Sequence, residues 1–274
     1  MPACESDMLS MPNDNSPSLR VKENRIICGD SREILPTIQT MSVDLVLTDP
    51  PYSINSKSDG QGKLSPWADY MNSAMFYEFW LRECKRILKP TGALWSFLNW
   101  RSFPVFAKAS CEVRWPMESV LVWDKKWIGP GGPNGLRPSY ELVALWAGPE
   151  FSIADRSLCD IKRCLWASAK PFHPAEKPVK LLRWLLEISG GQSVLDIFAG
   201  SGSVGVACVE LGRDFVGIEL DSGYAEVARR RIEAAVRQQR LEFGAGASAP
   251  LRVQRPTGDL LESLGEHGSD GTDK

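Results

Sequence analysis

Residues 193–205 read Ser-Val-Leu-Asp-Ile-Phe-Ala-Gly-Ser-Gly-Ser-Val-Gly, and after an apolar helical run the chain continues at 215–219 with Phe-Val-Gly-Ile-Glu. The pattern predicts a strand, a glycine turn, a helix and a second strand that ends in an acid, as in nucleotide-binding crossovers. Gly200 and Gly202 let the backbone approach a ligand closely, because glycine has no Cβ. The stretch therefore predicts an α/β fold.

The acid at the end of the second strand, Glu219, is placed to bind two ribose hydroxyls. A nicotinamide-binding fingerprint is the main alternative, since the glycines at 200, 202 and 205 satisfy G-x-G-x-x-G and Glu219 lies 19 residues after the first of them. Asp196 argues against it, because a carboxylate just before the turn would repel a pyrophosphate but could hold a cationic ammonium group. We also expect no second half of a dehydrogenase, since the chain ends about fifty residues later.

A second block, Asp49-Pro50-Pro51-Tyr52, follows the apolar run Val-Asp-Leu-Val-Leu at 43–47. The carboxylate of Asp49 and the carbonyl of Pro50 are acceptors that can bind both N–H bonds of an exocyclic amine of adenine or cytosine. Such an amine is a poor nucleophile because its lone pair is delocalised into the ring, and two acceptors free that lone pair. The prolines fix φ and remove competing donors, and Tyr52 offers an aromatic face to a planar base. The alternative is a Pro-Pro turn in which Asp and Tyr occur by chance.

A third block, His-Pro-Ala-Glu-Lys-Pro at 173–178, precedes the glycine turn. With three blocks in this order, over roughly residues 24–236, the chain resembles the permuted (beta-class) S-adenosylmethionine-dependent DNA amino-methyltransferases. In that family a Pro-Pro-Tyr or Pro-Pro-Phe block comes first and an F-x-G-x-G loop comes late. The resemblance implies a circularly permuted, Rossmann-like methyltransferase fold, with a single doubly wound, mostly parallel sheet of about seven strands and an antiparallel edge.

The residue at position 49 bears on the target base, because Asp rather than Ser there resembles the adenine-N6 enzymes more than the cytosine-N4 enzymes. The resemblance therefore implies a site-specific enzyme that methylates N6 of adenine in duplex DNA after flipping the base out. A cytosine-N4 enzyme remains an alternative because it uses the same residues. An RNA or protein-glutamine methyltransferase is a further one, although those relatives usually place the glycine loop first. The chain holds no nuclease motif, so we expect modification without cleavage.

The resemblance also implies roles for single residues. The predicted catalytic residues are Asp49, Pro50, Pro51 and Tyr52. His173 and Lys177 are expected near the methionine end of the cofactor, and Asp30, which ends a short strand, near its adenine. Asp30 is equally well explained as the N-cap of the helix that follows. The predicted cofactor-binding residues are Asp30, His173, Lys177, Asp196, Phe198, Gly200, Ser201, Gly202 and Glu219.

The net charge of −2 is low for a DNA-binding protein, but the charge is unevenly distributed. The segment 101–183 holds 13 Lys and Arg against 8 Asp and Glu, a local +5, whereas the segment 242–274 holds 6 acids and 3 bases, a local −3. A basic face is compatible with phosphate binding, and ordinary scattered surface charge is the alternative. The Gly/Pro-rich segment 124–140 is expected to include a long exposed loop. Its candidate DNA-binding residues are Lys125, Lys126, Trp127 and Arg137.

The resemblance implies double-stranded DNA as the partner, and it also implies a target-recognition segment before the third block, here at 149–172. These roughly 25 residues are too few for a full recognition domain. Recognition would then be shared with the Gly/Pro-rich loop, with a predicted mobile loop at 53–66, or with a second subunit. Both a monomer and a homodimer are compatible with this expectation.

The remaining pattern predicts a methyltransferase domain over 21–240, between a disordered lead at 1–20 and a disordered acidic tail at 241–274. Helices are predicted over 31–40, 69–88, 103–111 and 179–188, the last with Pro178 in its first turn, and strands over 93–100, 119–123 and 142–146, the last two antiparallel.

Several classes of protein are disfavoured. No apolar run approaches the roughly 20 residues of a membrane span, and the N-terminus lacks a secretory signal. Seven scattered cysteines fit reduced thiols and hence a cytoplasmic protein. Cys159 and Cys164 lie near His173 but lack zinc-site spacing, so no metal is predicted.

Overall fold

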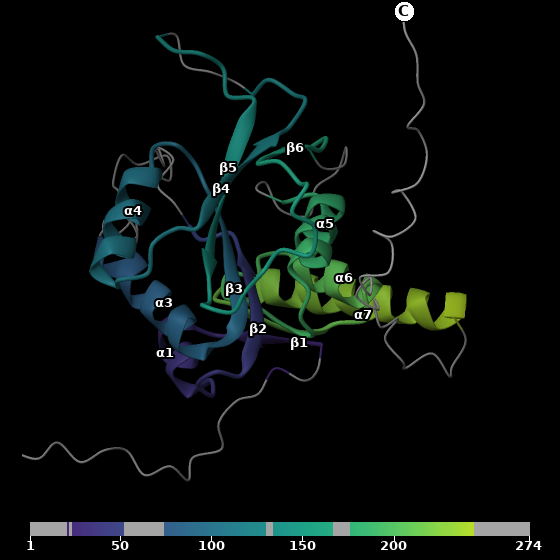
Figure 1. Cartoon of the computed structure of the whole chain (residues 1–274). Coiled ribbons are helices and arrows are strands. Elements are labelled where there is room, and N and C mark those ends of the chain that lie inside the picture. Colours follow the sequence, from purple (N-terminus) through teal and green to yellow (C-terminus); the bar gives the residue numbers. More distant parts are fainter. Residues whose placement is uncertain (1–20, 22–23, 52–73, 130–133, 167–175, 244–274) are drawn as a thin grey trace, which may run out of the picture.

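Eight strands form one sheet in the order β1-β8-β7-β2-β3-β5-β4-β6 in the computed structural model (Figure 1). The structure describes residues 21, 24–51, 74–129, 134–166 and 176–243. The strands are β1 (Arg25–Cys28), β2 (Val43–Thr48), β3 (Leu88–Leu98), β4 (Ser119–Asp124), β5 (Tyr140–Ala147), β6 (Ile161–Arg163), β7 (Ser193–Asp196) and β8 (Asp214–Glu219). All neighbouring pairs are parallel except those of β5, which runs antiparallel to both β3 and β4. The predicted α/β fold with a mostly parallel sheet is confirmed.

Strands β2 and β7 are neighbours at the centre of this sheet. Leu45 pairs with Val194 and Val46 with Leu195, so the two carboxyl ends lie side by side. Both strands are almost wholly buried, as is usual for parallel strands with helices on both faces. In doubly wound sheets, ligands bind beyond the carboxyl ends of such strands. The fold therefore brings the Asp-Pro-Pro block and the glycine turn to one edge of the sheet.

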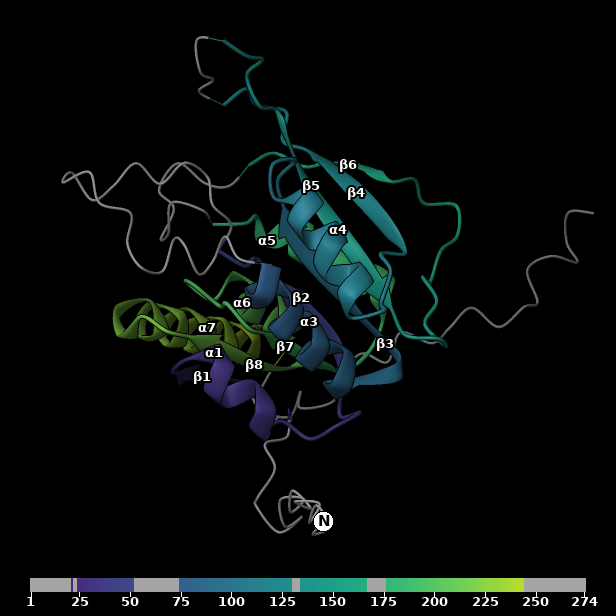
Figure 2. The same cartoon turned by 90° about the vertical axis from the view of Figure 1, so that its left-hand side faces the viewer.

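Helices cover both faces of the sheet (Figures 1 and 2). One face carries α1 (Ser31–Ile34), the 3₁₀ turn η1 (Leu35–Thr37), α3 (Ala74–Ile87) and α4 (Phe103–Glu112). The other face carries α5 (Val179–Ser189), α6 (Ser203–Glu210) and α7 (Ser222–Phe243).

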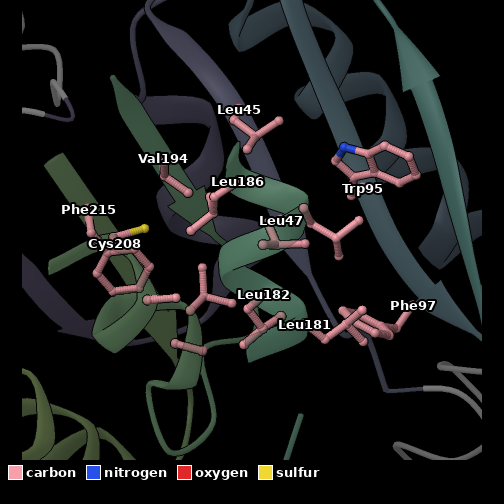
Figure 3. Close-up of a cluster of buried hydrophobic side chains, with 14 of the residues drawn as sticks. Leu45, Leu47, Trp95, Phe97, Leu181, Leu182, Leu186, Val194, Cys208 and Phe215 are labelled. Atoms are coloured by element: carbon pink, nitrogen blue, oxygen red, sulfur yellow. The ribbon is translucent and has the colours of Figure 1, made fainter. Parts of the chain in front are cut away.

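Helix α5 shows how sequence sets this packing. Its apolar residues recur at helical spacing, and Leu181, Leu182 and Leu186 are fully or almost fully buried in the cluster that also holds Leu45 and Leu47 of β2 (Figure 3). Burying each leucine contributes about 1.5–3 kcal/mol. Gly190, with φ of 68°, ends the helix where a side chain would be strained. Pro178, predicted in the first turn, is instead the extended N-cap residue.

Two predicted element boundaries are wrong. The helix predicted over 31–40 ends at Ile34 and a 3₁₀ turn follows, because Pro36 lacks a backbone N–H. The strand predicted from residue 93 begins already at Leu88, directly after α3, so Pro-Thr-Gly at 90–92 lies within β3. A register shift between Val43 and Leu45 of the paired strand accommodates this start.

The predicted antiparallel pair β4–β5 is present, but it does not form the edge of the sheet. The segment 149–172, in which the sequence predicts no sheet element, contributes strand β6, which pairs in parallel with β4. Its three residues, Ile-Lys-Arg, are too few to show a period. The described sheet therefore has eight strands rather than about seven.

Asp44 fixes the register of β2 at the amino-terminal side of the sheet. One of its oxygens, Oδ1, accepts a bond of 2.7 Å from Lys89 Nζ. The other, Oδ2, accepts bonds of 3.0 Å from the backbone N–H of Gln192 and of 2.9 Å and 2.8 Å from the N–H and hydroxyl of Ser193. A slip of one residue would turn every side chain of β2 to the opposite face. Asp44 therefore holds β2 against both the start of β7 and β3.

Two features are absent from the part of the chain that the structure describes. No helix there is long and apolar enough to cross a membrane. No group of three or more His, Cys, Asp or Glu side chains there is arranged to hold a metal ion.

Candidate active site

One pocket joins the ends of β2 and β7. Thr48 and Asp49 line one side, and the turn 198–201 lines the other, although about 150 positions separate them in the chain. The remaining lining residues are Phe97, Glu176, Lys177, Leu182, Asp196, Ser203 and Val204. The three sequence blocks thus contribute residues to one pocket.

Asp49 lies beyond the end of β2, with its carboxylate against Lys177 of the third block. Lys177 Nζ lies 2.5 Å from Asp49 Oδ2, and its side chain is almost wholly buried. The next residue, Pro50, is buried too. The hydroxyl of Tyr77 on α3 lies 3.4 Å from the carbonyl of Pro51 and donates to it. Burial raises the pKa of Tyr77 to about 12, so the hydroxyl keeps its proton and remains a donor.

Asp196, at the end of β7, is a buried carboxylate at the floor of the pocket. Its Oδ1 accepts hydrogen bonds of 2.8 Å from Thr48 Oγ1 and 3.1 Å from the backbone N–H of Phe198. Burial raises the pKa of Asp196 to about 7, and the negative charges of Asp49 and Glu219 act in the same direction. A cationic group bound there would stabilise the ionised form.

The glycine turn has an open side and a packed side. Gly200 has φ of 52°, and apart from its own chain neighbours no heavy atom of the described residues lies within 4 Å of the place where a Cβ would be. Gly202 has φ of 80°, and a Cβ there would lie 2.9 Å from Cβ of Ala228 on α7. Gly200 therefore leaves space for a ligand, whereas Gly202 allows close packing of the helix.

Glu219 lies directly opposite this turn. Its Oε2 accepts a bond of 2.7 Å from the N–H of Gly200, and its Oε1 accepts one of 2.9 Å from the N–H of Asp221. A carboxylate oxygen can accept more than one hydrogen bond, so both oxygens keep capacity for hydroxyl donors.

Arg231 on α7 is a residue of the site that the sequence does not reveal. Its guanidinium donates bonds of 2.8 Å to both the carbonyl and the hydroxyl of Ser201. It also forms an ion pair of 2.6 Å with Glu176 of the third block, and both side chains are largely buried. Arg231 therefore ties the glycine turn to the third block. Its position in a run of three arginines gives no signal that it differs from its neighbours.

Behind Lys177 lies a second buried pair, Glu141 of β5 and Lys125 just after β4. Glu141 Oε1 lies 2.5 Å from Lys125 Nζ, and its Oε2 lies 3.3 Å from Lys177 Nζ. The ammonium group of Lys125 is therefore buried, paired with Glu141 and close to the rings of Trp123 and Trp166. Its contact with DNA stays a prediction.

The other candidate DNA-binding residues are exposed. Lys126 has its side chain in solvent, and the indole of Trp127 lies 5.1 Å from that of Trp166, centroid to centroid. Arg137 donates to the carbonyls of Gly129 and Ile128, which shapes its own loop, and its side chain is exposed.

Asp30 acts as the N-cap of α1. Its Oδ1 accepts from the N–H of Arg32, and its carboxylate also pairs with the guanidinium of the same residue. The side-chain bond from Arg32 holds the pKa of Asp30 below its usual value. The cap role is thus observed, and the cofactor role stays a prediction. Tyr52, His173 and the predicted loop 53–66 lie outside the described residues.

A family model described as DNA methylase matches residues 43–168 and 155–230 of this chain. Putative methylase YubD of Escherichia coli (strain K12) is 30% identical over 222 residues, which cover 78% of this chain and 92% of that protein. DNA adenine methyltransferase YhdJ of the same organism is 27% identical over 247 residues, which cover 77% and 83%.

Solved structures agree in fold. TTHA0409 of Thermus thermophilus, described as a putative DNA modification methylase and solved as a complex with S-adenosyl-L-methionine, superposes with a TM-score of 0.61 at 23% identity and covers 77% of this chain and 94% of that one. PvuII DNA methyltransferase, described as cytosine-N4-specific, superposes with a TM-score of 0.63 at 17% identity and covers 80% and 93%. Together with the three sequence blocks and the pocket that joins them, the family match shows that this chain belongs to the DNA methylase family of N6- and N4-specific enzymes.

Proposed function

We propose that this protein transfers a methyl group from S-adenosylmethionine to N6 of adenine in duplex DNA. The observation that carries the proposal is the shared pocket, which Asp49 and the turn around Gly200 line together. Support for the methyl donor comes from TTHA0409, which was solved in complex with S-adenosyl-L-methionine.

The residues on the cofactor side of the pocket fit S-adenosylmethionine. The open space at Gly200 admits a ligand close to the backbone, and Glu219 beside it supplies acceptors for ribose hydroxyls. The buried carboxylate of Asp196 suits the ammonium group of the methionine part. When bound, S-adenosylmethionine supplies a methyl group that is activated by the sulfonium charge.

On the substrate side, Asp49 and the Pro50 carbonyl accept the two N–H bonds of the target amine. Their acceptors orient the nitrogen and free its lone pair, so binding and orientation supply most of the rate. The target base must leave the duplex to reach a pocket at the sheet edge, which costs a few kcal/mol. Stacking on Tyr52 is proposed to offset part of that cost.

The choice of adenine rests on Asp49 and on similarity to YhdJ, whose name gives adenine as its target. The cytosine-N4 alternative rests on the likeness to the PvuII enzyme, which has the same fold.

Mass spectrometry of nucleosides tests the proposal. DNA that lacks methylation is incubated with the protein and S-adenosylmethionine carrying an isotopic label in the methyl group, and we expect labelled N6-methyldeoxyadenosine. Detection of labelled N4-methyldeoxycytidine instead would show that the target base is cytosine rather than adenine. Label found in RNA or protein but not in DNA would refute the proposal as a whole.

A variant pair links the activity to the site. Asp49→Ala is expected to abolish incorporation while the affinity for S-adenosylmethionine, measured by calorimetry, changes by less than about twofold. Glu112→Ala, which removes an exposed carboxylate at the end of α4, is the matched control and should retain activity. Substantial turnover by Asp49→Ala would remove Asp49 from the mechanism.

A further inference from the structure

Four buried or half-buried charges of alternating sign extend from the pocket into the sheet. They are Asp49, Lys177, Glu141 and Lys125, in that order in space. Lys177 lies between the two carboxylates, with Nζ 2.5 Å from Asp49 Oδ2 and 3.3 Å from Glu141 Oε2. One ammonium group thus has two carboxylates within reach and lies closer to the one at the pocket.

The two oxygens of Glu141 differ in their contacts. Oε1 lies 2.5 Å from Lys125 Nζ and accepts a hydrogen bond from it. Oε2 is buried and forms an ion pair of 3.3 Å with Lys177 Nζ. This separation is longer than that of a charge-assisted hydrogen bond, so a short movement of Lys177 towards Oε2 would strengthen the contact.

Movement of Lys177 away from Asp49 would favour the chemistry that takes place at Asp49. Methyl transfer breaks the bond between the sulfonium sulfur and the methyl carbon and forms a bond from that carbon to the amine nitrogen. The electron pair of the broken bond stays on the sulfur, which becomes a neutral thioether, and the positive charge develops on the nitrogen. That nitrogen lies against Asp49 and later loses one proton to the solvent. An ammonium group paired with Asp49 opposes this charge, because like charges in a buried site repel strongly.

We propose that Glu141 is a positioning residue for methyl transfer: it draws Lys177 away from Asp49 when the target amine binds, so that the Asp49 carboxylate faces the amine without a competing ammonium group. The inference rests on the proposed function, since it concerns the same pocket and the same transfer.

The surroundings of Glu141 suit this role. Glu141 pairs with Trp123 across β4 and β5, which fixes its backbone. Burial alone would raise the pKa of Glu141, but the ammonium groups of Lys177 and Lys125 together outweigh it, so the carboxyl has a pKa below its usual value and stays ionised. Lys177 Nζ lies 5.0 Å from the centre of the Phe97 ring, which lines the same pocket, and this aromatic face stabilises the cation between its two partners.

Lys125 completes the arrangement, because it keeps Glu141 in place from the far side. Its ammonium group lies 5.3 Å and 5.1 Å from the ring centres of Trp123 and Trp166. Lys125 thus donates a hydrogen bond to Oε1 of Glu141, while Oε2 forms the ion pair with Lys177.

The test compares three variants with the wild-type enzyme by methyl incorporation into DNA and by calorimetric binding of S-adenosylmethionine. Glu141→Gln removes the charge that attracts Lys177 and keeps the size of the side chain. We expect turnover at saturating substrates to fall about tenfold, with cofactor affinity within about twofold of wild type. Glu118→Gln is the matched control, because it replaces an exposed carboxylate just before β4 by a carboxamide. It should leave both turnover and cofactor affinity unchanged.

The double variant Glu141→Gln with Lys177→Met separates positioning from structural support. Without the ammonium group Asp49 has no lysine to release, so at saturating S-adenosylmethionine the double variant should turn over faster than Glu141→Gln alone. A structural role for Glu141 predicts that the second substitution adds to the damage.

Three results would overturn the inference: wild-type turnover by Glu141→Gln, loss of cofactor affinity in that variant, or a double variant no faster than the single one. Absence of methyl incorporation by the wild-type protein would instead refute the proposed function, and the inference with it. The wild-type measurement therefore distinguishes the two failures.

Discussion

Thr48 and Asp196 lie 148 positions apart in the chain, yet the hydroxyl of Thr48 donates a hydrogen bond of 2.8 Å to Asp196 Oδ1. Both side chains are buried where β2 and β7 end. This bond joins the strand that precedes Asp49 to the strand that precedes the glycine turn, so it couples the two halves of the pocket.

Thr48→Val should therefore weaken the binding of S-adenosylmethionine. Valine matches threonine in shape but leaves Asp196 with one donor fewer, which makes the ionised carboxylate less stable. A hydrogen bond of this kind contributes about 1 kcal/mol, so the dissociation constant measured by calorimetry should rise about fivefold. Thr91→Val, on an exposed threonine of β3, is the control. Equal affinity in Thr48→Val and wild type would show that the bond has no bearing on the cofactor.

The affinity for S-adenosylmethionine should rise with pH. Burial, aided by the charges of Asp49 and Glu219, raises the pKa of Asp196 to about 7, so only the minority of molecules with Asp196 ionised can bind the ammonium group at about pH 6. Between about pH 6 and pH 8 the ionised fraction rises about tenfold, and the association constant should follow it. Calorimetry across this range in buffers of matched ionic strength measures the change.

The stability of the ligand-free protein should change in the opposite direction. The pKa of Asp196 in the folded protein, about 7, exceeds its ordinary value of 3.8, so the folded state binds more protons between these limits. Stability contributed by Asp196 is therefore present at low pH and lost as pH rises towards 7. Asp196→Asn should remove this loss and the pH dependence of binding together. A variant that kept the pH dependence of binding would assign that dependence to another group.

The two glycines of the turn should respond differently to substitution. Gly200→Val strains the backbone at φ of 52° but meets no packed neighbour on the pocket side, so cofactor affinity should fall strongly while Tm falls less than in the variant at Gly202. Gly202→Val forces a side chain against Ala228, so Tm should fall by several degrees through loss of packing between the turn and α7. Calorimetric binding and thermal unfolding of both variants give the comparison, and the reverse pattern would contradict the assignment of the two sides.

Arg231→Met should lower both Tm and cofactor affinity. The substitution leaves Glu176 without its buried ion pair, which costs about 3–5 kcal/mol, and removes two donors from Ser201 in the glycine turn. The neighbouring Arg230 is exposed and pairs with Glu226 on the same helix, so Arg230→Met is a matched control that should change neither quantity measurably. Identical behaviour of the two variants would show that Arg231 does not support the turn.

The fold was predictable because its signals are local. A glycine turn between an apolar strand and a helix specifies a crossover within about thirty residues, and two acids mark the strand ends. Since parallel strands share their carboxyl side, the same pattern also favours Asp49 and Gly200 at one edge of the sheet. Strand β6 was not predictable, because three residues cannot show a period.

The charge network was not predictable from the sequence, because its members meet only through tertiary packing. Nothing in the local pattern shows that Lys177 pairs with Asp49, or that Glu141 lies between two lysines. Lys125 illustrates the difficulty: it precedes a Gly/Pro-rich loop and has an exposed neighbour, Lys126, yet its own side chain is buried. Exposure of a lysine next to a loop depends on which aromatic rings pack around it.

Asp44 has a consequence for how variants of this enzyme would be interpreted. It sets the alignment of β2 with β7 and β3 from the side of the sheet remote from the pocket. A substitution there would misplace the reacting groups without touching them, and a screen would record it as a defect in chemistry. Laboratory evolution towards new target sequences should therefore keep this aspartate constant while it varies the opposite rim.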